Sequence, residues 1–90
     1  MQQGYQNSKQ KLLNAIANVI KNNRSVQNKS ISKISAEILM SKSMWADLEK
    51  GIKDPQFSTI WRICEALELP FESFVREIKQ ELGKDFTLID

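Results

Sequence analysis

Two short amphipathic runs follow each other with almost no chain between them, and this spacing is the strongest constraint on the fold. The first run covers Ser32 to Leu39 and the second covers Lys42 to Lys50, so that only Met40 and Ser41 separate them. Apolar residues recur in both runs at the spacing of a helix. Because the connection is too short for the second helix to fold back antiparallel to the first, we expect the two helices to meet at a steep angle.

This arrangement is that of a helix-turn-helix, whose second helix lies in the major groove of DNA. Ser41 is the predicted N-cap of the second helix, and Lys50 with Gly51 ends it. Trp45 and Leu48 lie three residues apart and are predicted to face the core. The residues left on the opposite face are Lys42, Ser43, Ala46 and Asp47.

Three further helical patterns complete an all-α domain of five helices. The first runs from Ser8 to about Gln27, and the fourth follows Asp54 and Pro55. The fifth ends at Gly83, and Pro70 fits its first turn. The predicted buried stripe of the fourth helix is Phe57, Ile60, Cys64 and Leu67.

The chain is long enough for one domain. Ninety residues with 41% apolar content allow a single modest core. Residues 1–7 are polar and lack periodicity, so we expect a flexible N-terminal tail. Residues 8–83 form the predicted helical domain with its C-terminal dimerisation helix, and residues 84–90 form a C-terminal tail whose role the sequence leaves open.

The residue inventory argues against catalysis and metal binding. The chain contains no histidine and one cysteine, Cys64, so His-based catalytic sites, metal-ligand clusters and an intrachain disulfide are not expected. We predict neither an enzyme nor a bound cofactor. The sequence shows no secretory leader and no apolar run long enough to cross a membrane, which predicts a cytoplasmic protein without membrane contact.

Charge is unevenly divided along the chain. Residues 1–45 carry a net charge of +6 and residues 46–90 carry −4, although the total is only +2. This division suits a protein that places one face on phosphates and keeps the other away from them. An unevenly charged, solvated surface without a binding role is an equally open interpretation.

Arg24 is a charged residue at a position that is predicted to face the core. It continues the apolar stripe of the first helix, so its cation points toward the core. A charge in that position is costly without an anion beside it. The pattern of the first helix therefore predicts an acidic partner elsewhere in the fold.

The segment LEKGIKDPQFSTIWRICEAL resembles the Cro/repressor-type (XRE-like) helix-turn-helix domains of phage repressors, restriction-modification controller proteins and antitoxin regulators. The resemblance covers roughly Leu12 to Phe74, and it implies that Arg24 pairs with Glu49. The chain departs from the family where Ile31 replaces the usual glutamine and Leu39 replaces the common turn glycine. The residues that carry the resemblance are Glu49, Lys50, Gly51, Pro55 and the run from Ile60 to Leu67.

The predicted faces of the second helix and the family resemblance together indicate candidate DNA-binding residues. Lys42 and Ser43 open the recognition helix and can bond base edges, while Asp47 can accept from cytosine or repel phosphates. Met44 can touch a thymine methyl or pack locally. Lys50 and Lys53 suit phosphate contacts, with solvent exposure as the alternative. The full predicted set is Ser41, Lys42, Ser43, Met44, Ala46, Asp47, Ile31, Lys33, Lys50 and Lys53.

The fifth helix carries more apolar residues than a small monomer needs. We therefore predict an exposed patch that joins two copies, which would bind a palindromic operator with recognition helices about 34 Å apart. The expected function is transcription regulation, most simply repression. The alternative is an antitoxin-like module that neutralises a partner protein (a toxin) through the fifth helix and C-terminal tail. The predicted dimer residues are Trp61, Val75, Ile78 and Leu82.

Overall fold

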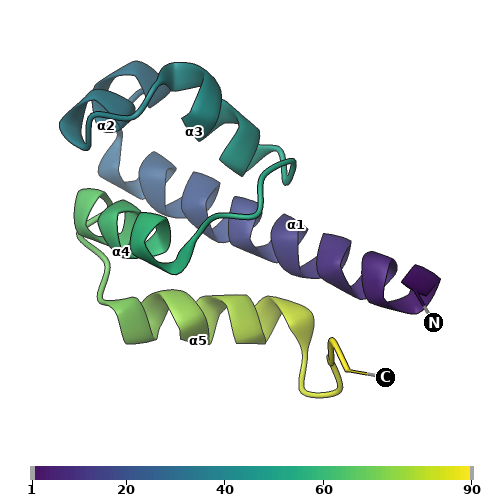
Figure 1. Cartoon of the computed structure of the whole chain (residues 1–90). Coiled ribbons are helices and arrows are strands. Elements are labelled where there is room, and N and C mark those ends of the chain that lie inside the picture. The colour runs from purple at the N-terminus through teal and green to yellow at the C-terminus, as the bar shows by residue number, and fades with distance from the viewer. Residues whose placement is uncertain (1, 90) are drawn as a thin grey trace.

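The computed structural model describes residues 2–89, which fold into five helices without a strand (Figure 1). The predicted all-α, five-helix architecture is confirmed. The helices are α1 (Gln2–Gln27), α2 (Ile31–Glu37), α3 (Lys42–Glu49), α4 (Phe57–Ala66) and α5 (Phe71–Leu82).

Helix α1 is the central element of the fold. Figure 1 shows α2 and α3 on one side of it and α5 running along the other. Its buried positions recur at helical spacing, so that Ile16, Val19 and Ile20 reach both layers. The core that they form includes Ile34, Trp45, Leu48, Ile63, Leu67 and Phe74.

The predicted start of the first helix is wrong. Helix α1 begins at Gln2 rather than Ser8 and is 26 residues long, so residues 2–7, predicted to be a tail, form its first turns. No proline interrupts this stretch, and Gly4 costs a helix only about 1 kcal/mol. Residue 1 of the predicted tail lies outside the described residues.

The connections between helices depend on capping and on left-handed residues. Ser30 Oγ accepts the backbone N–H of Lys33, and Ser41 Oγ accepts that of Met44, each at 3.1 Å. Ser30 is thus the N-cap of α2. Asn28, in the turn after α1, has a left-handed φ of 58°.

Leu39 occupies the turn between α2 and α3 with a φ of 55°. An L-residue with a side chain pays roughly 1–2 kcal/mol for this left-handed conformation, which is why glycine is common there. The Leu39 side chain is 93% exposed and recovers nothing by packing. The turn therefore forms despite its sequence, because the capped helices on either side determine its geometry.

Two predictions about apolar faces are wrong. Phe57, expected on the buried stripe, is 64% exposed, because it is the first residue of α4 and extends beyond the core. Ile78, expected on the dimer patch, is only 8% exposed and belongs to the core. Leu82, from the same predicted patch, is partly buried against that core, whereas Trp61 and Val75 do lie at the surface.

Candidate nucleic-acid interface

Helix α3 presents two faces of opposite character. Trp45 and Leu48 are buried at 0% and 2% exposure, as predicted from their spacing. The residues at the start of the helix, Lys42, Ser43 and Met44, are exposed together with the capping Ser41. Ala46 and Asp47, one turn further on, are half-buried. The structure thus brings together the predicted readout residues of α3 on the side away from the core.

A charge pair joins this helix to α1. Arg24 Nε donates to Glu49 Oε2 at 2.6 Å, and Arg24 Nη2 donates to Glu49 Oε1 at 3.0 Å. The pair predicted from the inward-pointing arginine is therefore present in bidentate form. The hydrogen bond with Glu49 raises the pKa of Arg24 above its usual value. Because the Glu49 side chain is only 7% exposed, the pair is shielded from solvent.

Two further bonds complete this group, which we call the Glu49 cluster (Arg24, Lys29 carbonyl, Trp45 and Glu49). Arg24 Nη1 donates to the Lys29 carbonyl at 2.9 Å, and Trp45 Nε1 donates to Glu49 Oε2 at 2.7 Å. Sequence reasoning missed the tryptophan bond, although the four-residue spacing of Trp45 and Glu49 places both side chains on one helical face. The Glu49 cluster holds the orientation of α3 on α1.

The loop after α3 is braced by the N-terminal half of α1. Gln10 Nε2 donates to the Gly51 carbonyl at 3.0 Å, and Lys9 Nζ lies 3.3 Å from Asp54 Oδ2. Gly51 has a φ of 74°, and a Cβ on it would lie 2.6 Å from Asn14 Oδ1. Glycine is favoured here by the left-handed conformation, and a Cβ would in addition require the Asn14 side chain to move.

Exposed cations flank helix α3. Lys33 lies on α2, Lys42 opens α3, and Lys50 and Lys53 stand in the following loop, all at the surface. Met44 and Lys53 line a common hollow with Gln56 and Thr59, so the start of α3 and the loop form one surface. Opposing charges in this region are partly neutralised, because Glu37 is bound by Lys29 at 2.9 Å.

Helix α2 contributes less than the α3 side does. Ile31 is half-buried and packs against the core, so its side chain is not displayed for contact with a ligand. Ser35 Oγ donates to the Ile31 carbonyl at 2.7 Å, inside the helix. An Arg62 Nη2 hydrogen bond to the Ile38 carbonyl ties the end of α2 to α4. Helix α2 thus packs on α3, and its C-terminal end is tied to α4.

Residues 2–89 offer little support for a metal site or a nucleophilic cysteine. No group of three or more potential acidic or thiol ligands within that range could hold a metal ion. Cys64 is buried, and burial raises the pKa of its thiol to about 11, so it is a neutral packing group rather than a nucleophile at pH 7. None of the described helices has both the length and the apolar character needed to cross a membrane.

Comparison with solved structures places this geometry in a known class. The chain is similar to the crystal structure of an HTH_3 family transcriptional regulator from Vibrio cholerae, with 29% identity and a TM-score of 0.73. The resemblance to the Cro/repressor-type helix-turn-helix family is thereby confirmed. The similarity covers 87% of this chain and 45% of the Vibrio protein. No protein-family model and no curated protein sequence matches the chain.

Proposed function

We propose that this chain is a sequence-specific, double-stranded-DNA-binding transcription regulator that acts as a homodimer. The observation that supports this most directly is the exposed, cationic start of α3, held on the core by the Glu49 cluster. A rigidly mounted helix with polar side chains at its first turn suits insertion into a major groove. The similar Vibrio protein is itself described as a transcriptional regulator.

Each surface residue has a role in this proposal. Lys42 and Ser43 bond base edges, Met44 touches a thymine methyl, and Asp47 accepts from cytosine N4 or excludes wrong sites. The small side chain of Ala46 allows α3 to approach the major groove closely. Contacts with the phosphate backbone come from the start of both helices and from the loop, through Ser41, Ile31 backbone, Lys33, Lys50 and Lys53.

The charge division supports an orientation in the complex. Three exposed acids lie in the half of the chain with a net charge of −4, namely Glu65 of α4, Glu68 of the connection to α5, and Glu72 of α5. In the proposed complex these three carboxylates face away from the phosphates, although Asp47, Lys50 and Lys53 of the same half lie at the interface. Two copies then read the half-sites of a palindromic operator and repress transcription by occluding a promoter in the cytoplasm.

The proposal predicts that Lys42→Ala with Ser43→Ala loses specific DNA binding. We expect roughly 100-fold weaker binding to the selected site, since each good base contact contributes about 1–3 kcal/mol. The salt dependence of binding should fall by about one unit of slope if Lys42 also neutralises a phosphate. Binding sites selected from random DNA, and DNA upstream of the coding region, provide the targets for titration.

Lys21→Ala with Ser25→Ala is the matched control. It also removes one exposed lysine and one exposed serine, but from α1, outside the proposed interface. This control should bind like the wild type. Specific readout by α3 is wrong if both double variants bind equally well, or if the wild type selects no sequence from random DNA.

A further inference from the structure

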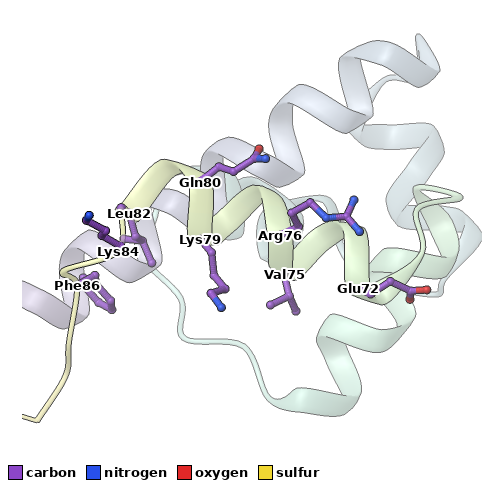
Figure 2. A pocket seen from close by; sticks show the side chains of 9 residues that line it. Glu72, Val75, Arg76, Lys79, Gln80, Leu82, Lys84 and Phe86 are labelled. Atoms are coloured by element: carbon purple, nitrogen blue, oxygen red, sulfur yellow. The ribbon is translucent and has the colours of Figure 1, made fainter.

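A groove runs along the outward face of α5 and has charged side chains at both ends. It is lined by Glu72, Val75, Arg76, Lys79, Leu82 and Phe86. In Figure 2, Val75 and Lys79 project to the same open side of α5, with Phe86 of the C-terminal segment at one end of the row and Glu72 at the other. Val75 is 36% exposed at the centre of the row.

Two acids of α5 are bound by α1, whereas in the described part of the chain the charged residues of the outward face are not. Glu77 accepts from Asn23 at 2.9 Å and Glu81 accepts from Asn18 at 2.6 Å, so these two carboxylates are bound to α1. Within residues 2–89, neither Glu72 nor Lys79 forms an ion pair. The two are seven residues apart and therefore share a helical face.

This arrangement is complementary to itself. A twofold axis perpendicular to α5, passing between Val75 and Arg76, makes two copies of the helix antiparallel. The axis then places Glu72 opposite the partner subunit's Lys79, and Lys79 opposite the partner subunit's Glu72. A parallel pairing would instead oppose like charges at both positions. Glu72 and Lys79 lie at equal distances from the axis, so each meets the opposite charge in a second copy, while Arg76 of each copy lies near the axis opposite the partner subunit's Val75.

Next to this face lies a second exposed apolar group, at the junction of α4 and α5. Phe57, Trp61 and Phe71 form an aromatic cluster, with Trp61 stacked on Phe71 at a centroid distance of 5.5 Å. Phe57 and Trp61 are 64% and 51% exposed. Helix α5 is about 18 Å long, so an antiparallel partner brings its C-terminal segment to this end of the groove.

We infer that a second copy of this chain docks on the outward face of α5, with the two α5 helices antiparallel and Glu72 paired with the partner subunit's Lys79. The inference rests on the homodimer in the proposed function and specifies its interface and register. DNA binding does not enter it.

Charge reversal tests the inference by sedimentation velocity and equilibrium of the full chain without DNA. Glu72→Lys alone and Lys79→Glu alone each create two like-charge contacts and should weaken dimerisation about tenfold or more. The double variant E72K/K79E exchanges the charges and should restore the wild-type dissociation constant to within about threefold. A mixture of the two single variants should form heterodimers of wild-type stability, because both contacts are then opposite in sign.

Lys21→Glu on α1 is the matched control and should dimerise like the wild type, since it reverses an exposed charge away from this face. Circular dichroism of every variant should show the helix content of the wild type. The inference is overturned if the single variants dimerise normally or if the double variant stays as weak as the singles. A monomeric wild type also overturns it, and leaves the face to a different protein. Lys42→Ala with Ser43→Ala should keep the dimer, so loss of DNA binding is distinguishable from loss of dimerisation.

Discussion

The α3 side and the α5 side of α1 treat their aromatic and acidic residues in opposite ways. On the α3 side, Trp45 is fully buried and Glu49 receives hydrogen bonds from Arg24 and Trp45 within the same chain. On the α5 side, Trp61 is half exposed, and Glu72 forms no ion pair among residues 2–89. The aromatic and acidic residues of the α3 side are thus buried or hydrogen-bonded within one chain. Those of the α5 side remain exposed, which is the composition of a surface that another molecule covers.

The largest expected difference is between two phenylalanines near the α4–α5 side. Phe74 is 1% exposed in the core, whereas Phe57 is 64% exposed in the aromatic cluster. Phe74→Ala should lower the free energy of unfolding by about 4 kcal/mol, since it opens a cavity. Phe57→Ala should cost less than about 1 kcal/mol at a concentration where the chain is monomeric. Urea unfolding followed by circular dichroism measures both, and similar losses would show that the cluster is part of the core.

The next difference compares two ion pairs whose carboxylates differ in exposure. Glu49→Ala should cost about 3 kcal/mol, because it leaves the Arg24 cation without its anion and the Trp45 N–H without an acceptor. Glu37→Ala breaks the pair with Lys29 and should cost less than about 1 kcal/mol, because the Glu37 side chain is 35% exposed against 7% for Glu49. An unchanged melting temperature for Glu49→Ala would contradict the structural importance of the Glu49 cluster.

The smallest expected effect is a gain in stability on the α3 side. Leu39→Gly should raise the free energy of unfolding by about 0.5–1 kcal/mol, because glycine adopts the left-handed turn without a steric cost but loses more entropy on folding. Asn28→Gly is the control, since asparagine already tolerates its φ of 58°, and it should gain less. A loss of stability in Leu39→Gly would mean that the exposed leucine makes a contact of its own.

The sequence was sufficient for the helix-turn-helix because its signals are local. Capping by Ser41, the spacing of Trp45 and Leu48, and the left-handed turn at Asn28 all depend on residues within a few positions of one another. The pair of Arg24 and Glu49 was also found, since an inward cation requires an anion and the family resemblance supplies one. The DNA contacts assigned to α3 remain proposals.

The lengths of the helices and the contacts between them are harder to predict from the sequence. The polar N-terminus has no apolar period, so nothing local indicated that α1 begins at Gln2. By its spacing alone Ile78 belongs to surplus apolar surface, although the core accommodates it. Phe57 has the spacing of a buried stripe, but at the first position of α4 it has no core residue to cover it. The last two errors concern which elements are adjacent, and the periodicity of one segment does not contain that information.

The bracing of α1 also limits how the chain can change in length. Gln10 binds the Gly51 carbonyl near one end of the helix and Arg24 binds Glu49 near the other, so both ends are tied to a single short segment. Inserting or deleting one residue between them would turn one end by about 100° relative to the other. One of the two attachments would then point into solvent. We therefore expect engineered insertions in this helix to be tolerated only outside the stretch between Gln10 and Arg24.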